Sequence, residues 1–406
     1  MVCIVHTHSE RRNRPAKTGR CNTFTARNTV HTVGKLACAT AGSQRGDNSN
    51  KQVRAQNFAL ARPAHERRNV DHVIDKIHKA RITPAGRTTV GRDFCSFPLA
   101  RYRFEWRATS PLRMPEYAGS MLRGAFGHAL RQLSCMTRQK QCEGCPLIAS
   151  CPFPAIFAPL PPDAHTLQKF SDIPVPYIIE PPDWGVSHLA EGDTFSFHLV
   201  LVGRAIKELP LIILAWRRAL ARGVGPDDGK AELVRVVHCG EAQEMEIHNP
   251  ESGTINEHEQ AITINTTAAQ VPDRVCLEFT TPLRLQRNGH ALAPHRLDAR
   301  TLLMALVRRT NLLSEFHAGG PLIGNFSALL QSCAAIVDEK NLTWRDWTRY
   351  SSRQKQAMTL GGVVGQWQLR GDLAPFYPYL LLGQWLHVGK EAAFGLGRYR
   401  LADTAA

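Results

Sequence analysis

A glycine-rich segment near the end of the chain, LHVGKEAAFGLGRYR, has residue types suited to phosphate binding. Its glycines can adopt positive φ and let a ligand approach the backbone closely, and its cations supply countercharge. It is not a nucleotide P-loop, because no Ser or Thr follows a Gly-Lys pair that closes a Gly-x4 loop. The alternative is a tight turn between strands. The residues concerned are Gly389, Gly395 and Gly397, with Lys390, Arg398 and Arg400.

Four cysteines within residues 135–151 are the second chemical feature. Two of them form a Cys-x2-Cys pair, and four thiolates at such spacing suit a tetrahedral structural Zn²⁺. The ion would hold together an insertion that is too polar to fold alone. The irregular spacing leaves a 4Fe–4S cluster or free thiols as alternatives. The predicted ligands are Cys135, Cys142, Cys145 and Cys151.

A helix predicted over residues 116–133 carries a histidine beside three glycines. At 100° per residue its large apolar residues share one face, and His128 lies beside the opposite face of small residues. Each glycine costs about 1 kcal/mol relative to alanine, so a close neighbour is expected there, either RNA or a packed element. A histidine can transfer a proton at neutral pH. His128 is therefore a candidate catalytic residue, with a structural role as the alternative.

Three segments resemble the RAMP superfamily of CRISPR-associated proteins, and most closely its precursor-crRNA processing endoribonucleases of the Cas6 type. They are LRGAFGHALR from Leu122, CEGCP from Cys142 with Cys151-Pro152 after it, and the stretch from Gly361 through GDLAP to the glycine-rich segment. The resemblance covers residues 97–403 and implies two tandem ferredoxin-like domains. The chain departs from the family at Glu391-Ala392-Ala393, where relatives more often have Gly and Thr. An acid beside a phosphate opposes binding by charge repulsion.

The resemblance also implies metal-independent cleavage of CRISPR repeat RNA, with no cofactor for catalysis. A general base takes the proton from a ribose 2′-OH, which attacks the adjacent phosphorus and leaves a 2′,3′-cyclic phosphate. The family often has its catalytic histidine on the first helix, so His128 is the candidate, with His387 as the alternative. Lys390 and Arg123 would stabilise the developing charge. The RNA-binding candidates are Arg123, Arg131, Arg284, Arg287, Arg398, Gly389, Gly395 and Gly397.

Two other classes of protein compete with this interpretation. One is a non-catalytic RAMP subunit that binds crRNA and holds an interference complex together. The other is a zinc-containing RNA-binding module unconnected with CRISPR. The partners implied by the resemblance are CRISPR repeat RNA and crRNA, with subunits of a CRISPR effector complex as further partners.

The order of predicted elements indicates an α+β protein with a repeated unit. The first unit has strands over 99–108, 194–202, 233–238 and 261–265, helices over 116–133 and 209–221, and a loop or edge segment over 152–182. The second has strands over 275–283 and 363–369, helices over 299–316 and 326–338, an apolar segment over 374–385 and a hairpin-like tail over 394–401. Asp298 is the expected N-cap of helix 299–316.

These elements predict two tandem ferredoxin-like (RRM-like) domains. The first covers residues 95–268 and contains the Cys-cluster insertion 135–151. The second covers residues 269–406 and contains the glycine-rich loop 387–397. Each has the size of an ordinary single domain.

The formal net charge of +15 suggests a nucleic-acid partner, but its distribution is uneven. Residues 1–94 hold 18 Lys+Arg and 6 Asp+Glu, a net +12, and the remainder holds 32 and 29, a net +3. The first segment has few aromatics and no regular period, which predicts a disordered basic extension, either an RNA tether or sequence read from a misassigned start. No uncharged apolar run of 18 residues and no secretory signal is present, so the sequence predicts a cytoplasmic protein without a membrane partner.

Overall fold

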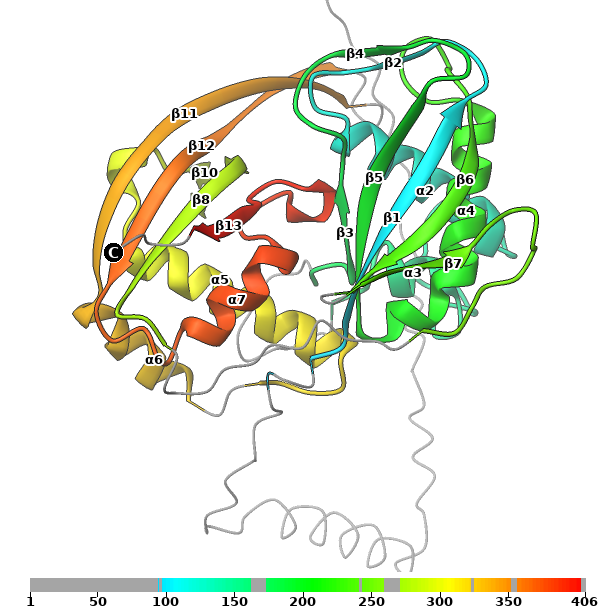
Figure 1. The fold of residues 1–406 in the computed structure, drawn as a ribbon. Helices are drawn as coiled ribbons and strands as arrows, with labels where there is room; N and C mark the ends of the chain where they lie inside the picture. The colour runs from blue at the N-terminus through cyan, green and yellow to red at the C-terminus, as the bar shows by residue number, and fades with distance from the viewer. Residues whose placement is uncertain are drawn as a thin grey trace, which may run out of the picture. The chain divides into compact units, whose positions relative to one another are not determined.

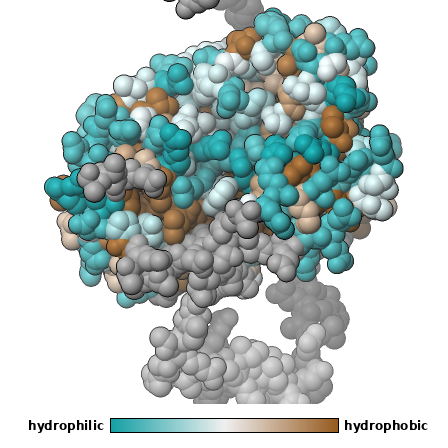
Figure 2. Space-filling model, in the orientation of Figure 1, coloured by the Kyte–Doolittle hydropathy of each residue, from teal (hydrophilic) through white to brown (hydrophobic). Residues whose placement is uncertain are grey.

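The computed structural model describes residue 94 and residues 97–161, 173–240, 243–258, 271–322, 325–351 and 356–402. The extension predicted to be disordered, residues 1–94, lies outside the described residues except for Phe94, and so does the strand predicted over 261–265. In the part that is described, no helix combines the length and the apolar character needed to cross a membrane. Figure 2 shows one face, on which hydrophilic residues predominate and apolar ones are scattered.

The first domain is built on a five-stranded antiparallel sheet of order β3-β5-β1-β6-β7 (Figure 1). Its strands are β1 (Leu99–Ala108), β3 (Tyr177–Glu180), β5 (Thr194–Val202), β6 (Ala231–Cys239) and β7 (Glu244–His248). Helix α2 (Gly119–Ser134) follows β1, and α4 (Leu209–Arg222) follows β5. Apart from the edge strand β7, this is a βαββαβ unit whose first and third strands lie at the centre, which is the ferredoxin-like arrangement.

The second domain repeats this arrangement. Its sheet has the order β11-β12-β8-β13, and its first and third strands, β8 and β12, are again central. The elements in chain order are β8 (Arg274–Leu283), α5 (Ala299–His317), β11 (Val337–Ser351), β12 (Gln356–Arg370), α7 (Tyr377–Leu386) and β13 (Tyr399–Ala402). The predicted α+β fold of two tandem ferredoxin-like domains is therefore confirmed.

Short elements connect the main ones. In the first domain these are β2 (Leu112–Met114), α3 (Pro152–Ile156), β4 (Ser187–Leu189) and the 3₁₀ helix η2 (Gly203–Glu208). In the second they are β9 (Gln286–Arg287), β10 (His290–Ala291), η4 (Pro294–Arg296), α6 (Phe326–Ser332), η5 (Cys333–Ala335) and η6 (Ala392–Phe394).

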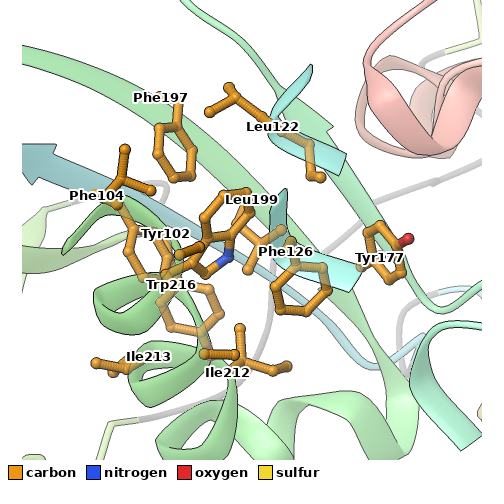
Figure 3. Packing of buried hydrophobic residues seen from close by; sticks show 14 of the residues in the cluster. Tyr102, Phe104, Leu122, Phe126, Tyr177, Phe197, Leu199, Ile212, Ile213 and Trp216 are labelled. Atoms are coloured by element: carbon orange, nitrogen blue, oxygen red, sulfur yellow. The ribbon is translucent and has the colours of Figure 1, made fainter. Parts of the chain in front are cut away.

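Alternation along β1 produces the core of the first domain. Tyr102, Phe104 and Trp106 are fully buried on the face covered by α2 and α4, while the charged residues between them, Arg103 and Glu105, lie on the other face. Phe126 of α2 stacks on Trp216 of α4 with ring centroids 5.0 Å apart (Figure 3). Burial of each large apolar side chain contributes about 1.5–3 kcal/mol, so this cluster fixes the position of α2 on the sheet.

Two apolar clusters join the domains. One combines residues of β1, β3 and β5 with residues of α5 and α7. The other surrounds Phe394 and Leu396 of the glycine-rich loop with Tyr117 and Trp347. The two domains thus share buried apolar surface, and the loop is part of it.

The structure identifies the neighbours of the small face of α2. A Cβ added at Gly127 would overlap the ring of Phe157, and one added at Gly119 would overlap the Phe394 carbonyl. At Gly124 an added Cβ would meet nothing within 4 Å. Two of the three glycines are therefore explained by packed elements of the protein itself.

These glycines give a matched pair of predictions for stability. Gly124→Ala should raise the free energy of unfolding by about 1 kcal/mol, because it restores helix propensity in open space. Gly127→Ala should lower it by about 1–3 kcal/mol, because the new methyl group overlaps Phe157. Denaturant unfolding of both variants checks this difference, and equal shifts of the same sign would contradict it.

The structure corrects the second half of the predicted element list. The helix predicted over 326–338 ends at Ser332, and Val337 begins β11, a long strand paired with β12 from Val337↔Arg370 to Ser351↔Gln356. Pairing along the whole of β12 outweighs the weak local helical preference of this segment. The predicted loop or edge segment 152–182 contains α3 and the edge strand β3, and the tail over 394–401 is not a hairpin, because β13 pairs with β8.

Candidate functional site

The glycine-rich loop lies at the junction of the two domains, beside β3 (Figure 1). The Tyr117 hydroxyl donates to the Phe394 carbonyl at 2.8 Å. Gly395 has φ +98°, and an added Cβ would lie 2.7 Å from the Ile179 carbonyl oxygen of β3. At Gly397, with φ +68°, an added Cβ would overlap the Val388 carbonyl. The space that the missing side chains leave at these glycines is thus occupied by the protein's own backbone. The loop packs into the interface between the domains.

His387 is the C-cap residue that follows α7, and it is completely buried in this interface. Its Nε2 lies 3.1 Å from Glu180 Oε1, and Glu180 also contacts Arg101 at 2.6 Å and Arg398 at 3.6 Å. Burial lowers the pKa of His387, so the imidazole is neutral and donates from Nε2. An enclosed imidazole that already contacts a carboxylate is unsuited to reach a ribose, and we therefore assign His387 a structural role.

The carboxylate of Glu180 is the centre of this buried group. Burial alone would raise its pKa, but the hydrogen bond from His387 and the charges of Arg101 and Arg398 hold the pKa well below its usual range. Glu180 thus stays ionised and links β1, α7 and the strand-entry residue Arg398.

A second buried histidine, His317, should make the free energy of unfolding depend on pH. Its Nε2 donates to the Pro174 carbonyl at 2.7 Å, and burial lowers its pKa to about 4. As the pH falls, His317 is protonated near pH 6.5 in the unfolded chain but only near pH 4 in the folded chain. The free energy of unfolding therefore decreases as the pH falls from about 6.5 to about 4. We expect a loss on the order of 3 kcal/mol across this window. Measuring the free energy of unfolding of His317→Gln and of the wild type at several pH values checks this expectation. The same slope of this free energy against pH in both proteins would contradict it.

The other candidate histidine, His128, is exposed. It lines a groove between α2 and α4, where Phe126–Trp216 stacking holds the two helices together. Arg222 donates to the side chain of Gln132 at 2.8 Å across this groove. An imidazole open to solvent beside two guanidinium groups can exchange a proton next to a bound phosphate. The lining residues are Ala125, His128, Ala129 and Gln132 of α2, with Arg218, Ala219, Arg222 and Gly223 at the end of α4.

Sequence reasoning did not select Arg218 and Arg222 of this groove. The two arginines are four residues apart on one helix and therefore lie on the same face. This spacing is visible in the sequence and could have identified them as a pair of cations. The predicted charge stabilisers, Lys390 and Arg123, do not line the groove.

The other predicted RNA-binding residues have varied surroundings. The guanidinium of Arg123 lies 4.6 Å from the ring centre of Phe157, and that of Arg284 donates to the Gly361 carbonyl at 2.7 Å. Arg131 donates to the carbonyls of Gln139 and Lys140. The remaining predicted cations have exposed or half-buried side chains: Lys390, Arg287 and Arg398.

A cleft between the domains combines aromatic rings and guanidinium groups. The guanidinium groups that line it are those of Arg398 and Arg400. Its two tryptophans each contact a further arginine: Arg345 lies 5.0 Å from the ring centre of Trp184, and Arg101 lies 5.7 Å from that of Trp385. Such surfaces can stack nucleobases and follow a phosphate backbone. Its lining includes Tyr117, Asp183, Trp184, Thr280, Thr281, Gln384, Trp385, Gly395, Arg398 and Arg400.

The four cysteines of the insertion line one pocket at the end of α2. All are half-buried free thiols. Burial raises the pKa of Cys142, and the charges of the other three thiolates act in the same direction. Within the described ranges, no three His, Cys, Asp or Glu side chains form a ready-made metal site. The zinc prediction thus has a common pocket but no preformed coordination geometry.

In the comparison with known proteins, the two domains match two different family models. Residues 97–260 match the family model of an N-terminal domain, AF_1859_N, and residues 277–399 match that of the CRISPR-associated endoribonuclease Cas6. An uncharacterized protein of Archaeoglobus fulgidus is 22% identical over 312 residues, which are 75% of this chain and 99% of that protein.

Solved structures with a related chain path include a Cas6 product complex, with a TM-score of 0.45 and 16% identity over 76% of this chain and 100% of that one. Thermus thermophilus Cas6 has a TM-score of 0.41 and is 14% identical over 76% of this chain and 99% of its own. A RAMP protein binding different RNA substrates has a TM-score of 0.37 and 10% identity over 75% and 100%. The family match over residues 277–399, from β8 to β13, shows that the second ferredoxin-like domain is similar to the CRISPR-associated endoribonuclease Cas6.

Proposed function

We propose that this protein binds CRISPR repeat RNA and cleaves it to crRNA in the groove between α2 and α4. The observation that carries the proposal is the exposed imidazole of His128 beside Arg218 and Arg222. The similarity of the second domain to Cas6 supports the choice of RNA as substrate. Among the two histidines suggested by the sequence, His128 is the one open to a substrate, since His387 is buried against Glu180.

The chemistry requires one proton acceptor and groups that stabilise negative charge. His128 takes the proton of the ribose 2′-OH, whose oxygen attacks the adjacent phosphorus while the bond to the 5′-oxygen breaks. Arg218 and Arg222 donate hydrogen bonds to the non-bridging oxygens, which gain charge in the transition state. The products are a 2′,3′-cyclic phosphate and a 5′-hydroxyl end. No step in this scheme requires a metal ion.

The cleft lined by Trp184, Trp385 and Arg398 offers a binding surface for RNA outside the scissile bond. Its arginines already have carboxylate partners, since Arg398 lies 3.6 Å from Glu180 and Arg400 lies 2.6 Å from Glu278. These carboxylates weaken the electrostatic attraction for phosphate, so stacking on the tryptophans carries the larger share of binding.

Incubation of the purified protein with its cognate repeat RNA, in buffer without added divalent cations, tests the proposal. Cleavage at one position, with a 2′,3′-cyclic phosphate on the 5′ fragment, is the expected result. Cleavage that requires added Mg²⁺ or Mn²⁺ would contradict the mechanism. Tight binding of intact RNA without cleavage would assign the protein to the class of non-catalytic crRNA-binding subunits.

A further inference from the structure

We propose that the insertion between α2 and α3 binds one structural zinc ion through Cys135, Cys142, Cys145 and Cys151. The insertion has no helix or strand over residues 135–151, yet α3 follows it directly and packs into the core of the first domain. A segment of turns at this point needs a local link to hold its two ends in place, and a four-thiolate zinc ion supplies one.

The backbone of the Cys-x2-Cys pair is folded as a tight turn. The Cys145 amide donates to the Cys142 carbonyl at 3.1 Å. Gly144, between the two cysteines, has φ +72°, a conformation that side chains rarely adopt. The turn places the two cysteines at the same pocket, as two ligands of one ion require.

The other two cysteines come to this turn from the ends of the insertion. Cys135 follows the last residue of α2, and the Cys151 thiol donates to the Ser134 carbonyl at 3.8 Å, so these two lie side by side. Thr137 connects the ends to the turn, because its hydroxyl oxygen lies 3.9 Å from Cys135 Sγ and 3.5 Å from Cys145 Sγ. All four thiols line one pocket, and binding would draw them inward to about 2.3 Å from the ion.

The ligand set favours zinc in a structural role. Four thiolates from one short segment match a closed tetrahedral site with no position for a substrate. Zinc at this point would link the end of α2 to the start of α3. Beyond Cys151, Phe153 is buried and stacks on Phe157, which in turn covers Gly127 of α2. The ion thus supports the helix that carries His128 without taking part in its chemistry.

Metal analysis of the full chain, purified without a metal-affinity tag, tests this proposal. One equivalent of zinc per chain is expected, with no visible absorbance. Replacement of zinc by Co²⁺ should produce the absorption bands of a tetrahedral thiolate site. Iron with a visible charge-transfer spectrum, or a folded protein that contains no metal and has four reactive thiols in the insertion, would overturn it.

Two variants separate the site from the other cysteines. Cys145→Ser should lose most of the zinc, whereas Cys239→Ser, at the end of β6 and outside the pocket, should keep it. If Cys145→Ser is unfolded, chelation of the wild-type protein provides the second measurement: zinc removal should lower the melting temperature and raise the number of titratable thiols by four. Retention of zinc in folded Cys145→Ser, or no change in reactive thiols on chelation, would overturn the proposal. These readouts do not depend on RNA cleavage.

Discussion

His128→Ala should lower the rate of repeat-RNA cleavage by about 10²–10⁴-fold, the usual contribution of a general base. The side chain is exposed on α2, so its removal leaves no buried cavity and should not change the free energy of unfolding measurably. Binding of the intact RNA should remain close to that of the wild type. Single-turnover cleavage together with a binding isotherm separates the lost chemical step from lost affinity.

A matched control is His290→Ala, which removes another exposed histidine in the second domain. This variant should cleave at the wild-type rate. Arg218→Ala should also lower the cleavage rate, because Arg218 lines the groove with His128. Wild-type cleavage by His128→Ala would remove this groove from consideration as the catalytic site.

Glu180→Gln should lower the free energy of unfolding by about 3–5 kcal/mol, the range found when one member of a buried ion pair is removed. The carboxylate is only 2% exposed and has three partners, Arg101, His387 and Arg398. Its loss would leave the largely buried guanidinium of Arg101 without its countercharge. Equilibrium unfolding in urea measures the effect.

The exposed pair Glu278–Arg400 offers a matched control for this variant. Its side chains are 31% and 69% exposed, and Glu278→Gln should cost less than about 1 kcal/mol. Because the pKa of Glu180 is held below its usual range, its contribution is present above about pH 4.3 and is lost as pH falls below that value. The difference between Glu180→Gln and wild type should therefore shrink in acid. Equal costs for the two variants at neutral pH would contradict the assignment of Glu180 as a buried centre.

Much of the fold could be predicted from local pattern. The alternation in LARYRFEWRA gave β1 with its observed bounds, and TFSFHLVLV gave β5. Asp298 is the N-cap of α5, since its carboxylate accepts from the Thr301 amide at 2.6 Å. Where the pattern is weak, as in VDEKNLTWRDW of β11, the strand depends on its pairing with β12 across the sheet, and local propensity does not report that pairing.

The candidate site was harder to predict, because exposure and partnership depend on distant residues. His387 and His128 look equivalent in the sequence, but 207 positions separate His387 from the carboxylate that encloses it. The glycines of the loop were expected to admit a phosphate, whereas Gly395 admits the backbone of β3. The residues within each segment do not show whether its contact will be a bound ligand or a distant part of the same chain.

The contacts of the glycine-rich loop also bear on how the protein folds. Tyr117 and Phe394 are 277 positions apart, so their hydrogen bond closes a loop that spans both domains. During synthesis, the first domain emerges with Glu180 and the apolar edge of β3 uncovered, and both stay uncovered until the segment after α7 has left the ribosome. Contacts of such sequence separation form late and slowly. The first domain alone should therefore aggregate or recruit a chaperone, and docking of the last strands should be the slow step of refolding.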